Sequence, residues 1–256
     1  MVEQNNKNFM TNKFLELKKR FNTDGYFVLE NFINGDFVLN LIEEINNSQD
    51  TIKYYDNSNK LRRIEKLYDK GKSLLKLNKQ ISNVLNNVFD EEFLIFKDKY
   101  NAKPPGGEGF FAHYDGIFQF ITSNNEKKNG WYEYGDFFVN ALVAIDDCNA
   151  ENGALELAKS HKGNFKELLS NTKKDGSPAL SKEVEQKTIF NLIGLNKGDM
   201  VVFSNTCPHR SKRNDSQNVR RIIYYTYTPS KYGSKYDQYF SDKDDSKNKS
   251  KALSEK

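Results

Sequence analysis

Two short segments of the chain carry residue types that bind metal ions. His113 and Asp115 are separated by a single residue. In an extended strand, residues two apart point to the same side, so this imidazole and this carboxylate are predicted to share one face. Two histidines and one carboxylate on one face of an octahedral metal leave three positions open, as in non-haem Fe(II) oxygenases. The third ligand must come from elsewhere in the fold, and the chain has only two other histidines, His161 and His209.

A hydroxyl and an arginine follow His209 at short range. Ser211 comes two residues later, and Arg220 opens a β-rich stretch. The co-substrate 2-oxoglutarate chelates Fe(II) through its C1 carboxylate and keto oxygen, and its far carboxylate needs a cation. The planar guanidinium of arginine can donate two parallel hydrogen bonds to such a carboxylate, so Arg220 and Ser211 suit this clamp. Arg220 and Arg221 point to opposite faces of the predicted strand, so only one of them faces inward.

Composition limits the classes of protein that need to be considered. The chain has 256 residues, with 39 basic and 35 acidic side chains and a net charge of +4. This excess is spread along the sequence, whereas nucleic-acid binding usually needs a concentrated basic face. No run approaches the roughly 18 apolar residues that span a bilayer, and the polar first residues lack the apolar core of a signal peptide. Two cysteines do not make a disulfide framework, so we expect a cytoplasmic protein that acts on a small molecule.

The order of the predicted elements separates a helical part from a β-rich part. Helices are predicted near residues 13–21, 37–45 and 78–89, with a short strand at 26–29 and a loop at 46–60. The strands of the second part are predicted at 93–103, 109–120, 137–145, 154–157, 199–203 and 219–228. The absence of a regular alternation of strands and helices argues against a doubly wound fold. A distorted β-sandwich or barrel with helices packed outside fits best.

Four segments together resemble the phytanoyl-CoA dioxygenase-like family of Fe(II)/2-oxoglutarate oxygenases. They are residues 24–29 (DGYFVL), His113-x-Asp115, residues 151–155 (ENGAL) with Ser160-His161, and the stretch from Gly198 through His209-Arg210-Ser211 to Arg220. The resemblance extends over about residues 18–230. It implies a mainly β protein with flanking helices, built as a double-stranded β-helix (a jelly roll of the cupin-like kind). Residues 1–240 would form one oxygenase domain, with a helical part at 13–90, a β-helix core at 91–230 and a disordered charged tail at 241–256.

The resemblance also implies roles for individual residues. His113, Asp115 and His209 would be the Fe(II) ligands, and Arg220 would grip 2-oxoglutarate, which reacts with O2 at the metal. Asn101, which lies in an Asn-x-Lys setting, would also contact 2-oxoglutarate. His161 matches a structural, pocket-lining position rather than a ligand. Some family members are halogenases with a small residue in place of the metal carboxylate, so the presence of Asp115 favours hydroxylation.

The substrate is predicted from the charges expected near the metal. If Asn101 faces the metal, then Lys99 and Lys103 on the same strand also face inward. Buried lysines need anionic partners, and Arg62 could cap such a pocket. The segment 103–110 resembles the organophosphonate hydroxylases of the family, so a small phosphonate is the leading substrate. The alternatives are hydroxylation of an amino acid or acyl compound, or a non-catalytic module that binds small anions on the same fold.

Overall fold

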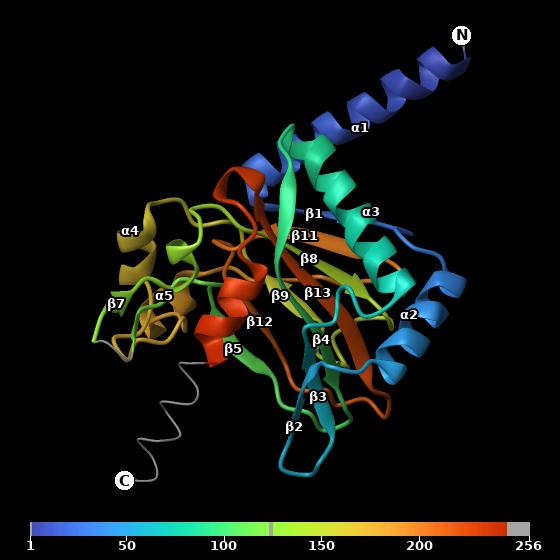
Figure 1. The fold of residues 1–256 in the computed structure, drawn as a ribbon. Helices are drawn as coiled ribbons and strands as arrows, with labels where there is room; N and C mark the ends of the chain where they lie inside the picture. The colour runs from blue at the N-terminus through green and yellow to red at the C-terminus, as the bar shows by residue number, and fades with distance from the viewer. Residues whose placement is uncertain (1, 123–124, 245–256) are drawn as a thin grey trace.

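The computed structural model describes residues 2–122 and 125–244, and its largest element is a seven-stranded antiparallel sheet (Figure 1). The strands follow the order β1 (Tyr26–Leu29), β11 (Met200–Ser204), β8 (Val139–Ala144), β13 (Arg220–Pro229), β4 (Phe93–Lys103), β3 (Leu61–Glu65) and β2 (Ile52–Tyr55). The two longest strands, β4 and β13, lie side by side near the centre, with Arg220 opposite Lys103 and Tyr224 opposite Lys99. Side chains two residues apart on these strands therefore form two parallel rows on the same face of the sheet.

A second, four-stranded antiparallel sheet lies against one face of the first. Its order is β10 (Asn191–Leu192), β9 (Leu155–Leu157), β12 (His209–Ser211) and β5 (Phe110–His113). Apolar side chains of both sheets, among them Leu142, Leu157 and Phe203, form one buried cluster between the two layers. Two antiparallel sheets packed face to face, with helices outside, confirm the predicted double-stranded β-helix. A separate two-stranded ribbon joins β6 (Phe120–Ile121) to β7 (Lys127–Lys128).

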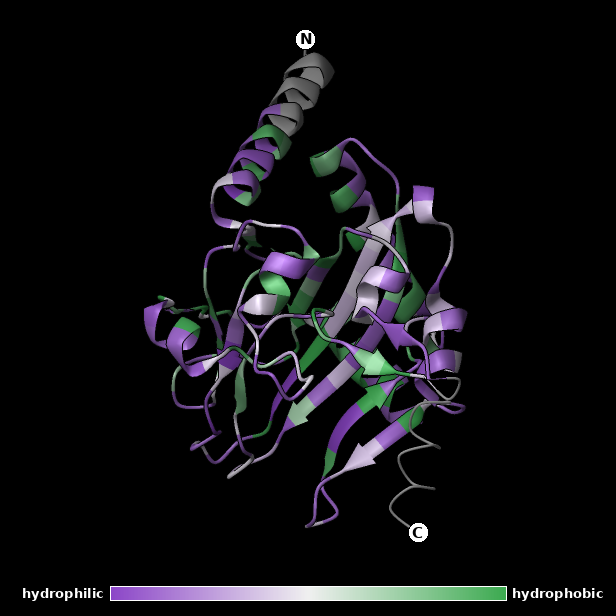
Figure 2. Cartoon of the chain, turned by 90° about the vertical axis from the view of Figure 1, so that its left-hand side faces the viewer, coloured by the Kyte–Doolittle hydropathy of each residue, from purple (hydrophilic) through white to green (hydrophobic). Residues whose placement is uncertain are grey.

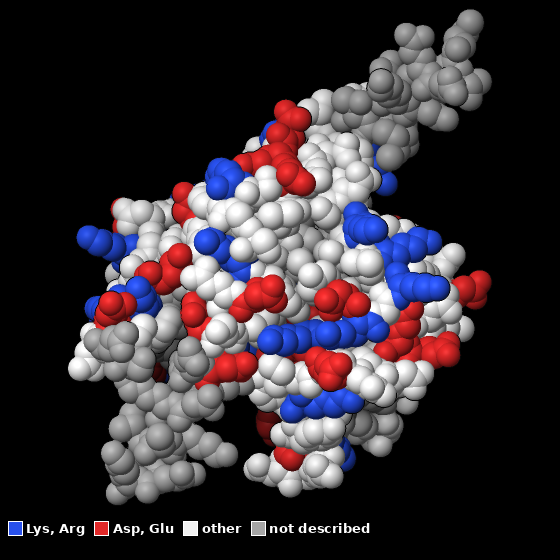
Figure 3. Space-filling model, viewed as in Figure 1, with Lys and Arg blue, Asp and Glu red and all other residues white. Residues whose placement is uncertain are grey.

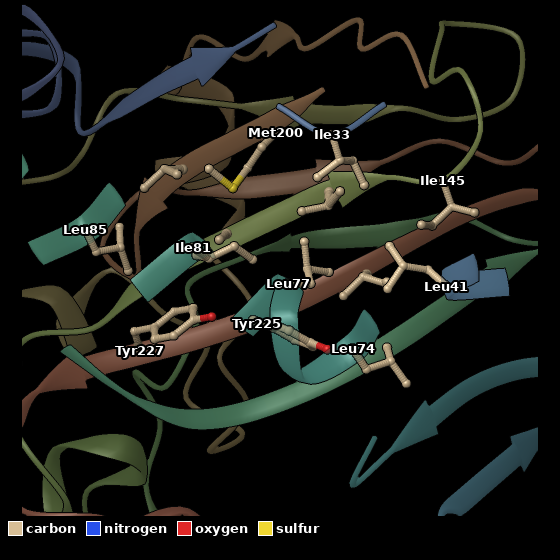
Figure 4. Close-up of a cluster of buried hydrophobic side chains, with 14 of the residues drawn as sticks. Ile33, Leu41, Leu74, Leu77, Ile81, Leu85, Ile145, Met200, Tyr225 and Tyr227 are labelled. Carbon is tan, nitrogen blue, oxygen red and sulfur yellow. The ribbon is translucent and has the colours of Figure 1, made fainter. Parts of the chain in front are cut away.

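Helices cover the opposite face of the seven-stranded sheet. They are α1 (Val2–Asp24), α2 (Gly35–Asn47) and α3 (Lys72–Phe89), whereas the short helices α4 (Phe165–Ser170) and α5 (Lys182–Lys187) lie beside the smaller sheet. Leu74, Leu77, Ile81 and Leu85 of α3 recur at helical spacing and are fully buried. This apolar face packs over the tyrosines of β13, as Figure 4 shows. The rigid platform that results holds the other face of β4 and β13 towards the second sheet.

The structure departs from the sequence-based prediction in the N-terminal part. Residues 52–55 and 61–65 form strands β2 and β3, whereas a loop was predicted over residues 46–60 and no strand at 61–65. Strand β1 pairs with β11 and β3 pairs with β4, so the predicted helical part supplies three strands of the main sheet. Strand β2 is half-exposed and polar at the edge of the sheet, which removes the apolar alternation that would have revealed it.

The C-terminal segment also differs from the prediction. Residues 236–244 are helical, so residues 241–244 are not part of a disordered tail, and residues 245–256 lie outside the described residues. Two polar contacts hold this helix to the sheet: the Tyr236 hydroxyl donates to Asp98 at 2.8 Å, and Lys243 pairs with the buried carboxylate of Glu65. These contacts join residues 138 and 178 positions apart, which local sequence patterns do not reveal.

The surface shows mixed charge rather than one dominant sign. On the face drawn in Figure 3, acidic and basic side chains are interspersed. Green and purple segments follow one another along the strands in Figure 2, as expected when apolar and polar residues alternate. Within residues 2–122 and 125–244, no helix combines the length and apolar content that crossing a membrane requires.

Candidate active site

The structure brings His113, Asp115 and His209 together between the two sheets. His113 ends strand β5, and His209 begins the neighbouring strand β12 directly opposite it, with the ring centres 4.2 Å apart. The Nε2 atom of His209 lies 3.5 Å from Asp115 Oδ2, and that of His113 lies 4.0 Å from Oδ1. All three side chains are buried, and one ligand atom from each lies within 4.8 Å of the others. These donors fit an octahedral Fe(II) ion bound on one face.

Backbone carbonyls orient both imidazoles. The Nδ1 atom of His113 lies 2.9 Å from the Phe111 carbonyl oxygen, and Nδ1 of His209 lies 3.1 Å from that of Cys207. A carbonyl only accepts hydrogen bonds, so each Nδ1 carries the proton and each Nε2 keeps a free lone pair for the metal. Burial, with the neighbouring His209, lowers the pKa of His113 to about 3, and burial lowers the pKa of His209 as well. Both rings are therefore neutral near pH 7, which is the form that binds metal.

Two donors fix the carboxylate of Asp115. The Tyr224 hydroxyl donates to Oδ2 at 2.5 Å, and the Asn140 amide donates to the same oxygen at 3.0 Å. The Asn140 side-chain carbonyl in turn accepts a hydrogen bond from Thr226 at 2.8 Å. Burial acts to raise the pKa of Asp115, but attraction to the His209 ring, once that ring is protonated in acid, and to the Lys99 ammonium outweighs it and holds that pKa well below its ordinary value. The aspartate is thus ionised, with Oδ1 left for the metal.

We predict that Tyr224→Phe weakens Fe(II) binding by about 10- to 100-fold, the usual effect of losing a partner that orients a metal ligand. The change removes the hydroxyl that donates to Asp115 and keeps the ring. Anaerobic titration with Fe(II), or with Co(II) as a spectroscopic substitute, measures the dissociation constant. Tyr225→Phe is the matched control, because the buried Tyr225 hydroxyl has no hydrogen-bond partner among the described residues. Equal affinity in the two variants would contradict the role given to Tyr224.

Arg220 lies at the start of β13, and only 5% of its surface is exposed. Its Nε atom has no hydrogen-bond partner, and no carboxylate lies within 4 Å of its guanidinium, among the residues that the structure describes. The neighbouring Cys148 does not supply a charge, because burial raises the pKa of its thiol to about 11. An unpaired buried guanidinium is costly. The donor therefore fits a carboxylate supplied by a bound molecule such as 2-oxoglutarate.

Lys103 lies beside Arg220 but is already hydrogen-bonded within the protein. Its ammonium donates to Ser211 Oγ at 2.9 Å, to the Gly153 carbonyl at 3.2 Å and to the Lys212 carbonyl at 2.5 Å. These three contacts use all three protons of the ammonium. Because Ser211 accepts from Lys103, its own hydroxyl proton remains available for another acceptor.

A pocket of about 400 Å³ connects the predicted residues. His113, His209, Arg220, Ser211 and Asn101 line it, as do Lys99, Lys103 and Arg62. Six basic side chains and one acidic side chain, Glu108, line it, and three of the basic ones (Arg62, Arg63 and Arg210) pair with carboxylates outside the lining. The basic side chains are Arg62, Arg63, Lys99, Lys103, Arg210 and Arg220. A pocket with this balance favours small anions.

The structure places His161 away from the metal ligands. Its Nδ1 atom lies 2.5 Å from the Tyr114 hydroxyl, which also accepts a hydrogen bond from Asn171 at 3.1 Å. His161 is not in the group of residues whose ligand atoms converge. Its position is consistent with the structural role expected for it, since it helps to hold the residue between His113 and Asp115.

Sequence analysis did not identify several residues that complete the site. Strand alternation predicts Tyr224 and Thr226 on the inward face with Arg220, but it assigns them no contact with the metal site. Asn140 lies in the middle of an apolar strand, where an amide that needs partners is itself a signal. Glu65 had no local signal, since the cation that pairs with it, Lys243, is 178 residues away.

A double-stranded β-helix with a buried group of two histidines and one aspartate defines the class of non-haem Fe(II)/2-oxoglutarate oxygenases. The chain belongs to the phytanoyl-CoA dioxygenase (PhyH) family, whose model matches residues 21–222. It is therefore an Fe(II)/2-oxoglutarate-dependent dioxygenase that uses O2, as the motifs predicted.

Two relatives of known activity resemble the chain in sequence. A 2-aminoethylphosphonate dioxygenase of the uncultured bacterium HF130_AEPn_1 is 28% identical over 242 residues, which cover 89% of this chain and 86% of that protein. A methylphosphonate hydroxylase of Gimesia maris is 26% identical over 166 residues, covering 64% of this chain and 56% of that protein. These likenesses match the phosphonate branch to which the sequence was compared.

Solved structures confirm the fold at lower sequence identity. The α-ketoglutarate-dependent epimerase SnoN of nogalamycin biosynthesis superimposes with a TM-score of 0.65 at 14% identity, over 85% of this chain and 84% of that one. EctD of S. alaskensis, solved with 2-oxoglutarate and 5-hydroxyectoine, gives a TM-score of 0.64 at 17% identity, over 84% and 76% of the two chains.

Proposed function

We propose that the protein hydroxylates a small organophosphonate at the carbon next to phosphorus. The observation that carries this proposal is the cationic pocket beside the metal ligands, in which six basic side chains face one acidic one. Phosphonates carry up to two negative charges and three acceptor oxygens, which match ammonium and guanidinium donors. Two phosphonate-oxidising relatives support the same substrate class.

The residues of the site divide between the co-substrate and the substrate. Arg220 and the Ser211 hydroxyl bind the far carboxylate of 2-oxoglutarate, and Asn101 contacts the same molecule from β4. Lys103 supports Ser211 instead of binding substrate, because its three protons are already used. Lys99 and Arg62 remain for the phosphonate. Arg62 also lies 3.8 Å from Asp56 and donates to the Glu108 carbonyl at 3.4 Å, so it lies at the rim of the pocket.

The chain contributes position, charge and exclusion of water to the reaction. Ferrous iron, when bound, supplies the activation of O2 that couples oxidation of 2-oxoglutarate to succinate and CO2 with hydroxylation of the substrate. His113, Asp115 and His209 would hold the ion through three ligand atoms, and its remaining coordination sites would take the reactants. Arg220 lies four residues before Tyr224 on β13, roughly 13 Å away at 3.3 Å per residue. The long side chain of Arg220 covers part of this distance, and the carbon chain of a bound 2-oxoglutarate covers the rest.

The test is release of succinate that depends on substrate. Protein with Fe(II), ascorbate and 2-oxoglutarate is supplied with 2-aminoethylphosphonate or methylphosphonate, and in parallel with amino acids and acyl compounds. We expect succinate only with phosphonates, together with a new phosphorus-31 resonance from the hydroxylated product. Turnover of an amino acid or acyl compound instead would overturn the substrate class. No succinate with any compound would favour a non-catalytic anion-binding module. We also propose the cytoplasm as the compartment, consistent with two buried free thiols.

A further inference from the structure

Two lysines on the inward face of β4 have no polar partner. Within residues 2–122 and 125–244, neither Lys97 Nζ nor Lys99 Nζ has a hydrogen-bond acceptor, or a carboxylate within 4 Å. Lys99 Nζ lies 3.9 Å from the centre of the Tyr224 ring, and Lys97 Nζ lies 5.2 Å from the centre of Trp131 and 5.5 Å from that of Tyr239. An aromatic ring attracts an ammonium group electrostatically, but it does not supply hydrogen-bond acceptors for the three ammonium protons. Partly buried ammoniums in this state are donors that await an anion.

The position of this pair separates it from the 2-oxoglutarate end of the site. In the pairing of β4 with β13, Arg220 lies opposite Lys103, Tyr224 opposite Lys99 and Thr226 opposite Lys97. The Tyr224 hydroxyl donates a hydrogen bond to the metal ligand Asp115. The paired residues of β13 and β4 therefore run from Arg220 and Lys103, reach the metal at Tyr224, and continue beyond it to Lys97. Lys97 therefore lies on the side of the metal remote from Arg220, two residues from Lys99, which lines the pocket.

The charges around the pair leave a positive excess. Glu65 is completely buried and lies 3.5 Å from Arg63, accepts a hydrogen bond from Tyr54 at 2.9 Å and pairs with Lys243. The groups that act on one another here are four basic side chains and three carboxylates: Arg63, Lys97, Lys99, Lys243, Glu65, Asp98 and Asp115. When both lysines are protonated, four positive charges against three negative ones leave an excess of one. Burial lowers the pKa of Lys97 and lowers that of Lys99 to about 7, so a bound anion would favour their charged forms. Fe(II) and the 2-oxoglutarate dianion cancel each other, so their binding leaves this excess in place.

We infer that Lys97 and Lys99 form a binding site for the dianionic tetrahedral head group of the substrate, beyond the metal as seen from Arg220. The inference rests on the proposed function and adds Lys97 to the residues that contact substrate. Two ammoniums on alternate residues of one strand start about 7 Å apart and can converge on separate oxygens of one head group. The helix at 236–244 closes the far side of this site, since Tyr239 packs beside Lys97 and Lys243 balances Glu65.

Calorimetric titration of the metal-free protein tests the site without requiring turnover. Methylphosphonate and inorganic phosphate are the probes, with methanesulfonate and acetate as singly charged comparators. We expect saturable binding of the two probes and at least about 10-fold weaker binding in Lys97→Met and in Lys99→Met, the effect of losing a charged hydrogen bond. Trp131 is the only tryptophan and its ring lies next to Lys97, so its fluorescence should change when a probe binds. In Lys99→Met the same change should need higher probe concentrations than in the wild type.

Two further variants keep the inference falsifiable. Lys231→Met removes an exposed lysine that pairs with Glu91 and should bind the probes like the wild type. In Arg220→Gln the lysine site should keep its wild-type affinity for the probes, because the two anion sites are separate, and only a second binding event at Arg220 should be lost. Loss of probe binding in Arg220→Gln, with none in the Lys97 and Lys99 variants, would overturn the inference. If the probes bind as expected but no phosphonate yields succinate, the proposed function fails while this site stands.

Discussion

Asp115→Ala is expected to lower Fe(II) affinity by more than about 100-fold and to abolish succinate release. Loss of an outer partner of a metal ligand usually costs 10- to 100-fold, and this change removes a ligand itself. It also leaves the hydroxyl of Tyr224 and the amide of Asn140 buried without the acceptor that they now share. Anaerobic Fe(II) titration and a succinate assay measure the two effects separately.

Asp215→Ala is a suitable control for the loss of a carboxylate. Asp215 is exposed and pairs with the exposed Arg213 at 3.4 Å, so we expect wild-type metal binding and turnover. The thermal unfolding midpoint of both variants shows whether each protein is folded. If folded Asp115→Ala protein bound Fe(II) and released succinate like the wild type, the ligand assignment would be wrong.

Arg220→Gln is expected to raise the KM for 2-oxoglutarate by at least about 30-fold. Truncating one partner of a buried charge pair costs about 2–5 kcal/mol, and 1.4 kcal/mol corresponds to a factor of about 10. Glutamine keeps a polar side chain of moderate length but cannot supply the positive charge or the paired donors of the guanidinium. Steady-state kinetics with 2-oxoglutarate as the varied reactant measures the change.

The adjacent arginine gives a matched control for this prediction. Arg221 points to the other face of β13 and makes a two-pronged ion pair with Asp146, at 2.8 and 2.7 Å. Arg221→Gln should lower stability slightly and leave the KM for 2-oxoglutarate unchanged. A rise in KM of equal size in both variants would mean that the strand, and not the inward guanidinium, is responsible.

The metal ligands were predictable because a local rule acts on them. Alternation along a strand places His113 and Asp115 on one face, and a chain with three histidines leaves few choices for the third ligand. The same rule placed Lys99 and Lys103 on one face, but it could not distinguish their roles. That difference depends on the Gly153 and Lys212 carbonyls, which long-range folding brings to Lys103.

The β-rich core was predictable for a similar reason, whereas its edge was not. Central strands such as β8 are apolar apart from single residues such as Asn140 and are bounded by turn residues. The edge strand β2 and its neighbour β3 carry charged residues, and β3 pairs with β4 through residues 36 and 38 positions apart (64 with 100, 63 with 101). Glu65 looked like one more surface charge in a mixed segment, and only the fold shows that it is enclosed.

The helix at 236–244 sets the order in which the site is completed during synthesis. The metal ligands end at residue 209, and the last strand of the core ends at residue 229. Tyr239 and Lys243 emerge from the ribosome after all of them, so a nascent chain can assemble the iron ligands while the side next to Lys97 is still open to water. The side of the site next to Lys97 is thus completed only by a segment that is translated after the core.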